Sequence, residues 1–503
     1  MNQNNQTHRT ILKDIAHRVM LERGLLPDFS AAALAELGKQ PSTSANDSHT
    51  IRDRRNLPWA SIDNDDSRDL DQLTVAIPPA STQNGGDMPS DMLKILVAIA
   101  DVDFSIKKGS AIDEHARTNT TSVYTAAEIF PMLPEEISTD TASLNLDKDR
   151  IAIVVEMLIN ADGSIQESMI SSGWVRNHAR LSYNSVAAWL EKRAELPQEI
   201  AAVPGLAENL QIQDQAAQRL KGLRHLHGAL SLETAEARPV FDGDQIQTLD
   251  IDEKNRAKEI IENFMIATNS IIARYLSANG SPSIRRVVRT PKRWDRIVKI
   301  ASDHEYDLPE YPDSKALEGF LVHQKAADPV RFADISLAVI KLLGAGEYAA
   351  ELPDANAPGH FGLAVKDYAH STAPNRRYPD LTTQRLLKAI LDGKPSPYSK
   401  DELDVLAAHC TQAEDAANKV ERQVGKSAAA LLLETRIGEQ FDAIVTGASE
   451  KGTWVRLLSL PIEGRLVHGF EGLDVGERVR VELTLADVQR GFIDFKKIIF
   501  SGH

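Results

Sequence analysis

The fold and the chemistry of this chain are best approached from one acidic stretch, Ser61-Ile62-Asp63-Asn64-Asp65-Asp66-Ser67-Arg68-Asp69-Leu70-Asp71-Gln72. Five aspartates within nine residues repel one another unless something positive neutralises them. Side chains of an extended segment alternate with period two, so Asp69 and Asp71 point to the same side. Leu70 lies between them, and the apolar run Leu73–Ile77 follows. We therefore expect a loop that enters a buried strand, with Asp63 reaching in from the preceding strand end.

Three converging carboxylates, from Asp63, Asp69 and Asp71, suit magnesium, with manganese as an alternative. Such a site supports metal-assisted phosphodiester hydrolysis, in which a pair of ions about 3.5–4 Å apart clamps the attacking and leaving oxygens. Two other interpretations stay open. The alternate spacing resembles an EF-hand loop, but Arg68 and Thr74 stand where that loop needs Gly and Glu. A solvated acidic turn is the other, although apolar residues are threaded through the run.

The remaining pattern predicts an α+β fold. Strands are expected first, at Leu73–Ile77, Ile95–Val102 and Ile151–Ile159, and long helices later, at Ala257–Leu276 and Leu381–Leu391. Two short helices, around Ile11–Arg23 and Ser30–Leu37, precede a polar linker from Gln40 to Thr50. They could form a small winged helix or a helical cap, or simply pad the next domain.

The C-terminal part changes character after a helix expected over Ser399–Glu434. Glycines punctuate the tail from Ile437 to Ile498, at 447, 452, 464, 472, 476 and 491 among others, which is typical of a small OB-type barrel. The five short strands expected there are Phe441–Thr446, Thr453–Leu457, Gly464–Val467, Arg478–Leu483 and Gly491–Lys496.

Composition excludes several classes of protein. The 503 residues carry a net charge of −15, which argues against indiscriminate coating of nucleic acid or of anionic membranes, but not against a local RNA path. Cys410 is the single cysteine, so an internal disulfide, a thiolate zinc cluster or a disulfide-linked partner is not expected. The polar N-terminus and the short apolar runs predict a cytoplasmic protein without a membrane span. The oligomeric state is left open.

The acidic stretch resembles the opening catalytic motif of the ribonuclease II and ribonuclease R family, the RNB-domain exoribonucleases. Further blocks follow in the family's order over about 330 residues, and they are more specific together than any one alone. These blocks are Ile99–Val102, Thr121–Tyr124, Pro131–Glu135, Ser143–Leu144, Ile260–Asn269, His360–Leu363 and Tyr368–Leu381. The resemblance implies an N-terminal helical segment at 1–50, an RNB domain at 51–396, a helical connector at 397–435 and an RNA-binding OB fold at 436–503. It also implies a short form, because tandem cold-shock domains do not fit into fifty residues.

The resemblance also implies roles for single residues. Asp63, Asp69 and Asp71 would hold magnesium, Tyr124 would stack on the 3′-terminal nucleotide, and Arg376 would stabilise charge on the scissile phosphate. Arg377 is a further candidate for RNA binding. The alternatives are a structural ion-pair network around Arg376, Arg377 and Asp380, and a plain core aromatic at Tyr124.

A second candidate for RNA binding is the basic segment from Arg285 to Lys299. It carries seven basic residues and one acidic residue, and Arg289 and Trp294 within it suit backbone neutralisation and base stacking. A solvated basic helix face is an equally good interpretation of this composition.

The chain departs from the family pattern at several positions. Gln72 replaces an aspartate that the family uses in its active site, and an amide brings neither a negative charge nor a base. Arg289 and Gln384 stand where a histidine is usual, and Ala373 and Asn375 change the arginine motif. Despite these departures, the resemblance implies a magnesium-dependent 3′-to-5′ exoribonuclease that converts single-stranded RNA to nucleoside 5′-monophosphates. The alternatives are an RNA-binding protein with a catalytically impaired RNB domain, and an endonuclease or a processor of one structured RNA.

Overall fold

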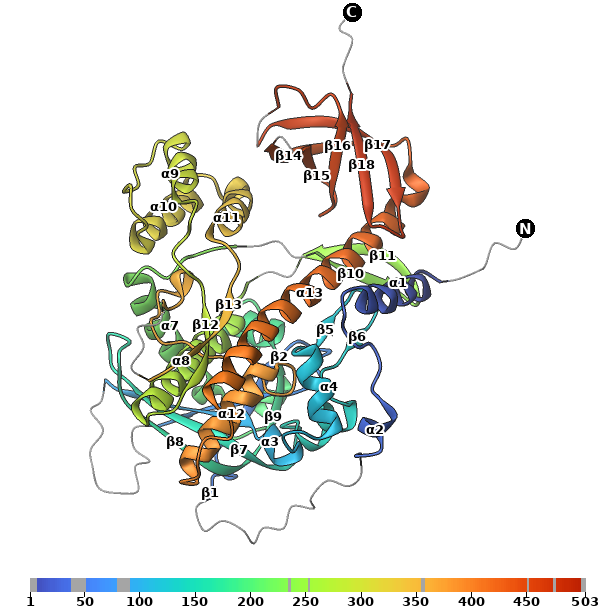
Figure 1. Cartoon of the computed structure of the whole chain (residues 1–503). Helices are drawn as coiled ribbons and strands as arrows, with labels where there is room; N and C mark the ends of the chain where they lie inside the picture. The colour runs from blue at the N-terminus through green and yellow to red at the C-terminus, as the bar shows by residue number, and fades with distance from the viewer. Residues whose placement is uncertain are drawn as a thin grey trace, which may run out of the picture.

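The computed structural model describes residues 7–37, 51–78, 91–233, 237–251, 254–353, 358–449, 452–473 and 476–498. Figure 1 shows a lower body of sheet and helices, an upper helical lobe, and a small barrel at the end of one long helix. The predicted linker from Gln40 to Thr50 lies outside the described residues. No described helix is long and apolar enough to span a membrane.

Seven described strands form the central sheet, in the order β1-β8-β7-β4-β3-β2-β9. β1 runs parallel to β8 and β2 parallel to β9, and the other neighbours are antiparallel. The apolar runs predicted as strands form β3, β4 and β7, whose side chains are almost all buried. The bounds are β1 (Arg52–Asp53), β2 (Ala60–Asp63), β3 (Gln72–Ile77), β4 (Leu93–Ala100), β7 (Asp149–Ile159), β8 (Ile165–Arg176) and β9 (Ala179–Ser182).

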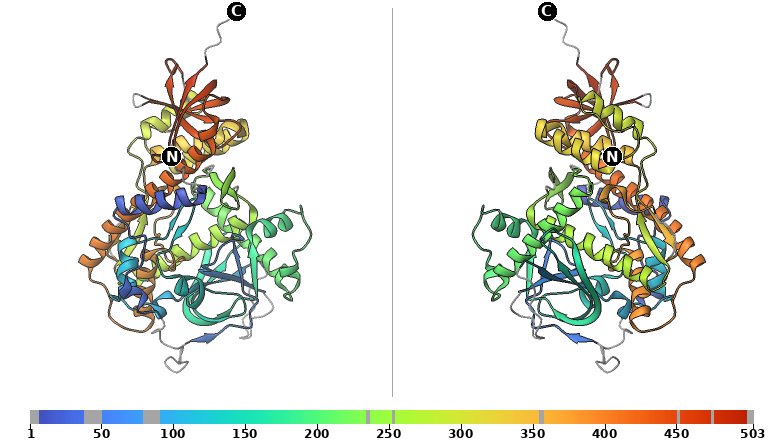
Figure 2. Two further views of the ribbon diagram at one scale, coloured as in Figure 1. Left: turned by 90° about the vertical axis from the view of Figure 1, so that its right-hand side faces the viewer. Right: turned by 90° about the vertical axis from the view of Figure 1, so that its left-hand side faces the viewer.

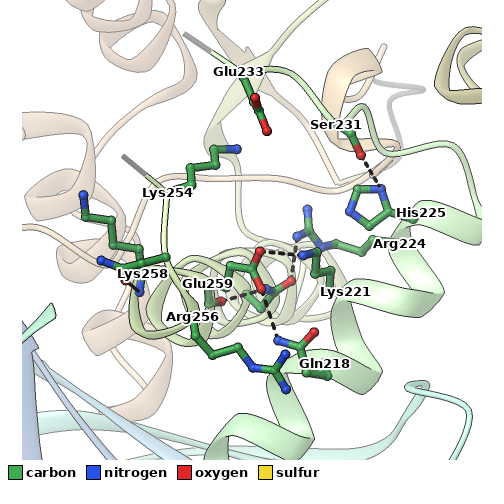
Figure 3. Close-up of polar contacts among 12 residues, drawn as sticks. Gln218, Lys221, Arg224, His225, Ser231, Glu233, Lys254, Arg256, Lys258 and Glu259 are labelled. Atoms are coloured by element: carbon green, nitrogen blue, oxygen red, sulfur yellow. Dashed lines mark hydrogen bonds and ion pairs between the residues drawn. The ribbon is translucent and has the colours of Figure 1, made fainter. Parts of the chain in front are cut away.

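Helices cover this sheet, and Figure 2 shows them from two sides. α7 (Leu206–Leu226) and α8 (Arg256–Ala278) pack against each other, and α12 (Tyr378–Leu391) lies on β4. Polar contacts join α7 to α8: Glu259 accepts from Lys221 and from Gln218 (3.2 Å) (Figure 3). Shorter elements fill the edges, namely α3 (Val102–Ser105), α4 (Ala111–Asn119), β5 (Val123–Tyr124), β6 (Ile129–Phe130), a π-helix (Glu136–Thr141), α5 (Tyr183–Leu190) and α6 (Gln198–Ala201).

A helical lobe rises from a two-stranded stem. The stem strands are β12 (Ser283–Val287) and β13 (Glu347–Glu351), and the lobe helices are α9 (Trp294–Asp303), α10 (Ser314–Ala327) and α11 (Pro329–Leu343). The lobe has its own apolar core, in which Phe320 and Phe332 are fully buried. A 3-10 turn (Phe361–Leu363) lies against its base.

The long helix α13 (Lys400–Leu433) confirms the helix predicted over Ser399–Glu434. It begins with a capping box, because Ser399 accepts from the Glu402 amide while the Glu402 carboxylate accepts from the Ser399 amide. Its C-terminal end, followed by a short 3-10 turn (Glu434–Arg436), supports the barrel. Gly491 of the barrel lies so close to this helix that an added Cβ would be 2.8 Å from Lys426 Cβ.

Five described strands close the C-terminal barrel in the order β14-β15-β16-β18-β17, which confirms the predicted OB-type fold. Buried residues alternate with more exposed ones along β15, β16, β17 and β18, and side chains such as Val455, Val481 and Phe495 fill the interior. The bounds are β14 (Gln440–Ser449), β15 (Gly452–Leu457), β16 (Glu463–His468), β17 (Arg478–Asp487) and β18 (Phe492–Lys497).

The N-terminal segment pads the other domains. α1 (His8–Glu22) packs on α13 and on the hairpin of β10 (Ala237–Asp242) and β11 (Gln245–Ile251), while α2 (Ala31–Leu34) lies beside α4. α2 is shorter than the predicted helix over Ser30–Leu37. Residues 7–37 contain helices and no strand in the described structure, so no wing accompanies them there.

Candidate active site

The acidic stretch forms the loop between β2 and β3, as its pattern predicts. Asp63 ends β2, Gln72 begins β3, and Asp69 and Asp71 lie in the loop just before that strand. Leu70 is buried between the two aspartates and fixes this part of the loop to the core. Asp65 and Asp66 are exposed and point away from the buried residues. Asp63, Asp69 and Asp71 therefore lie at the candidate site, whereas Asp65 and Asp66 lie at the surface.

Asp71 is the most deeply buried carboxylate of the loop, with 2% of its surface exposed. Its Oδ1 accepts from the Asn375 backbone amide at 3.0 Å, and its Oδ2 lies 3.6 Å from Arg376 Nε without a hydrogen bond. Burial raises the pKa of Asp71 to about 8, opposed by the positive charge of Arg376. A carboxylate held in this way is stabilised by a further positive charge.

Asp63 and Asp69 are partly buried, and both have polar side-chain contacts. Gln72 Nε2 donates to Asp63 Oδ2 at 3.1 Å, and the Tyr124 hydroxyl donates to Asp69 Oδ2 at 3.3 Å. Burial raises the pKa of Asp63 to about 6 and also raises that of Asp69. Asp69 raises the pKa of both other aspartates through its charge, which shows that the three carboxylates interact.

Arg376 is the countercharge that these groups share. Its positive charge lowers the pKa of Asp63, Asp69 and Asp71, and also that of the Tyr124 hydroxyl, against the larger effect of burial. The arginine side chain is 44% exposed, so its guanidinium also faces solvent. A half-exposed fork of donors beside buried carboxylates is suited to a phosphate oxygen.

Tyr124 and Arg376 are connected through the backbone. The Ser122 amide donates to the Arg376 carbonyl at 3.0 Å, the Tyr378 amide donates to the Thr120 carbonyl at 2.8 Å, and Thr121 forms a β-bridge with Arg377. Thr120 takes the left-handed backbone conformation (φ 58°), which turns the chain from α4 into this arrangement. Tyr124 is 40% exposed and is therefore not a core aromatic.

The polar atoms around Asp71 determine whether the site fits a divalent cation. Within the described ranges, no three acidic, histidine or cysteine side chains converge as a metal-binding group, and the assignment of Asp63, Asp69 and Asp71 as three metal ligands stays a prediction. The buried Asp71 Oδ2 without a hydrogen bond and the hard oxygen donors around it still fit such a cation. Magnesium commonly takes one or two carboxylates and completes its ligands with water and substrate phosphate.

The other predicted residues have different surroundings. Arg377 donates to Asp380, which is fully buried, at 2.7 Å, so the ion-pair alternative describes it. Trp294 is 4% exposed in the lobe core and donates to the Pro309 carbonyl, so its ring is not available for stacking and that prediction is corrected. Arg289 is exposed and pairs with Glu347 at 2.6 Å, and its RNA contact stays a prediction.

Gln384 and Asn375, which both depart from the family pattern, are buried. Gln384 is buried and connects α12 to β4: its Nε2 donates to the Ala100 carbonyl at 2.7 Å, and its Oε1 accepts from the Asp103 amide at 3.0 Å. Asn375 is 1% exposed, and neither polar atom of its side chain has a hydrogen-bond partner. Gln384 is thus structural, while the Asn375 amide is an unpaired buried group.

Arg180 was not found from the sequence. It lies on β9 and donates to the Asp65 carbonyl (3.3 Å) and the Ser67 carbonyl (2.5 Å), and its charge lowers the pKa of Asp63. An isolated arginine more than a hundred residues from the loop carries no signal in one sequence. Its contact depends on the parallel pairing of β9 with β2, which only the fold shows.

Comparison with known proteins agrees with this architecture. Residues 51–393 match the family model described as the RNB domain, and residues 439–498 match the RNase II-type exonuclease C-terminal S1 domain. Ribonuclease R of Vibrio parahaemolyticus is 30% identical over 435 residues, covering 83% of this chain and 50% of that protein. The chain thus spans about half the length of this curated relative.

Solved structures show the same fold at lower identity. Mycoplasma genitalium RNase R in complex with ribose methylated single-stranded RNA has a TM-score of 0.85 and 22% identity, covering 98% of this chain and 79% of that chain. Yeast Ssd1, described as a pseudonuclease, has a TM-score of 0.71 and 16% identity, covering 90% of this chain and 55% of that chain. At these identities the likeness concerns the fold alone.

Proposed function

Because this chain belongs to the RNB-domain family, we propose that it is a magnesium-dependent 3′-to-5′ exoribonuclease that hydrolyses single-stranded RNA to nucleoside 5′-monophosphates. Enzymes of this family generally depend on divalent metals. The observation that carries the proposal is the arrangement around Arg376, where one half-exposed guanidinium serves three interacting carboxylates beside an accessible tyrosine.

Each side chain has a role that its surroundings support. Asp71, with Asp63 or Asp69, would hold the cation, and a bound divalent cation supplies charge stabilisation at the phosphate and activates water. Arg376 donates to the phosphate where negative charge develops. Tyr124 offers its ring to the terminal base, and its hydroxyl restrains Asp69. Gln72 orients Asp63 through its amide.

One observation favours a second function, an RNA-binding protein with a silent RNB domain. The side-chain amide of Gln72 donates to Asp63 and adds no negative charge to the site. One unit charge at about 4 Å is worth on the order of 4 kcal/mol at an effective dielectric of 20, which corresponds to roughly a thousandfold in rate. The same fold also occurs in yeast Ssd1, described as a pseudonuclease.

A time course on single-stranded RNA labelled at either the 3′ or the 5′ end, with magnesium, decides between these functions. We expect stepwise loss of nucleotides from the 3′ end, which Asp71→Asn abolishes. Asp65→Asn is the matched control, because it removes the same charge from an exposed position of the same loop. No turnover in the wild type but turnover in Gln72→Asp would support the silent domain. Internal cleavage products would support an endonuclease.

A further inference from the structure

The helical lobe is firmly attached at its base. Glu318 of α10 is 6% exposed and accepts from the Ser231 amide (2.6 Å), the Ser231 hydroxyl (2.6 Å) and His225 Nδ1 (2.9 Å). His225 belongs to α7, and Figure 3 shows it beside Ser231. The Ser231 hydroxyl and the Glu318 carboxylate both contact the same imidazole nitrogen, so these residues are not a catalytic triad. They are a buried anchor between the lobe and the body.

The barrel is attached to the body through α13, β11 and α1. Ala430 and Leu433 at the end of α13 lie in the apolar core of the barrel, together with Leu249 of β11. Arg18 of α1 donates to the carbonyl of Gln489 in the barrel at 3.1 Å. The lobe and the barrel therefore rise from different supports of the same body (Figure 1).

Among the described residues, one ion pair joins the lobe to the barrel. Arg456 of β15 donates from Nη2 to Oδ2 of Asp334 on α11 at 3.2 Å, and its Nη1 lies 2.9 Å from Oδ1 without a hydrogen bond. The Asp334 side chain is 10% exposed and that of Arg456 is 28% exposed. Breaking this pair would leave the Asp334 charge largely out of water and without its nearest countercharge.

The charges around the pair support its assignment as an interdomain contact. Glu463 on β16 raises the pKa of Asp334 through its negative charge, and Arg331 on the same helix as Asp334 lowers it. Glu463 is itself engaged by the Thr446 hydroxyl within the barrel, at 2.7 Å. Arg456 is thus the barrel residue that faces the buried acid directly.

We propose that the Asp334–Arg456 pair is a clasp that holds the barrel in one position over the RNB domain, so that a single RNA strand engages the barrel and the active site together. This inference rests on the proposed function, because it takes RNA as the ligand of both parts. Two linked sites bind one strand more tightly when their separation is fixed at a distance that the strand can span. The clasp therefore determines how affinity depends on RNA length.

The test compares two fluorescent oligoadenylates in EDTA, so that no hydrolysis occurs. One is about 20 nucleotides long, more than one OB fold covers, and the other is about 5 nucleotides long. In Arg456→Ala we expect the Kd for the long RNA to rise about tenfold, while the Kd for the short RNA changes less than about twofold. The reversed pair, Asp334→Arg with Arg456→Asp, should restore most of the loss.

Arg480→Ala is the matched control. It also removes one arginine from the barrel, but its partner Asp442 lies within the barrel, at 2.8 Å. An equal loss in Arg456→Ala and Arg480→Ala would overturn the clasp, because charge alone would then explain it. Tighter RNA binding by Asp334→Asn would also overturn it, since the acid would then be a competitor of RNA.

If the wild type bound neither RNA, the proposed function would be refuted. A second measurement tests the clasp without RNA. Dyes on Tyr311→Cys in the lobe and Glu471→Cys in the barrel, both exposed positions, report the distance between the two parts. Cys410 is fully buried and does not compete for the label. Arg456→Ala should broaden the distribution of distances, and an unchanged distribution would refute the clasp.

Discussion

Replacing Gln72 by aspartate should make the stability of the protein depend strongly on magnesium. The amide now donates to Asp63 Oδ2 at 3.1 Å. A carboxylate in its place would lose that hydrogen bond and stand about 4 Å from a like charge, which costs up to about 4 kcal/mol at an effective dielectric of 20. Protonation of one partner limits the cost, so this figure is an upper bound.

The expected change in melting temperature follows from that figure. At roughly 2 °C per kcal/mol for a large domain, Gln72→Asp should melt up to about 8 °C below the wild type in EDTA near pH 8. Saturating magnesium should reduce this difference, because the added carboxylate should tighten cation binding, and each tenfold gain in affinity adds about 1.4 kcal/mol of stability at saturation. Differential scanning calorimetry in EDTA and in excess magnesium measures both quantities.

The control for this experiment is Gln72→Asn, which has nearly the shape of the aspartate variant but no charge. It should lose some stability through the missing hydrogen bond and show no additional response to magnesium. An equal magnesium response in Gln72→Asp, Gln72→Asn and the wild type would refute the reasoning. Position 72 would then not lie within reach of the bound cation.

Three further predictions concern the same site. For Asp71, whose folded pKa of about 8 lies above its ordinary 3.8, the folded protein binds more protons, so metal-free stability should fall as the pH rises from about 4 to 8. Urea titrations across that range should show this slope, and a slope unchanged in Asp71→Asn would contradict it. Tyr124→Ala should raise KM for short RNA about tenfold with little change in melting temperature, since the ring is 40% exposed and stacking is worth about 1–3 kcal/mol. Asn375→Leu should stabilise the protein by about 1 kcal/mol in urea titrations, because it removes a buried amide with no partner, and destabilisation would show that the amide is engaged in solution.

Local patterns were sufficient for much of the fold. The five strands of the barrel were predicted as short runs between glycine turns, and the helix that forms α13 was predicted from a stretch rich in alanine and charged residues. The acidic loop was predicted from the period of its aspartates and the apolar run that follows. In each case, the signal lies within about ten residues of the element that it specifies.

The missed features depend on long-range geometry. Trp294 in a basic segment has the composition of an RNA-binding face, but the packing of α9 against α10 and α11 turns its ring into the lobe core. The Asp334–Arg456 pair joins residues 122 apart, and neither position stands out in the sequence. The same limit applies to the metal ligands, because loop geometry determines which of Asp63, Asp69 and Asp71 can meet at one point.

The backbone connections between residues 120–122 and 376–378 have a consequence for how this site tolerates mutation. Main-chain hydrogen bonds do not depend on the identity of the side chain, so the interval between the Tyr124 ring and the Arg376 guanidinium is preserved when neighbouring side chains vary. If one of these segments moves, the hydrogen bonds move the other with it, so the backbones at Tyr124 and Arg376 keep their relative position. Proline is the exception at position 122, because it would remove the N–H that donates to the Arg376 carbonyl. A change of side chain thus leaves these main-chain connections in place, whereas loss of the Ser122 amide proton removes one of them.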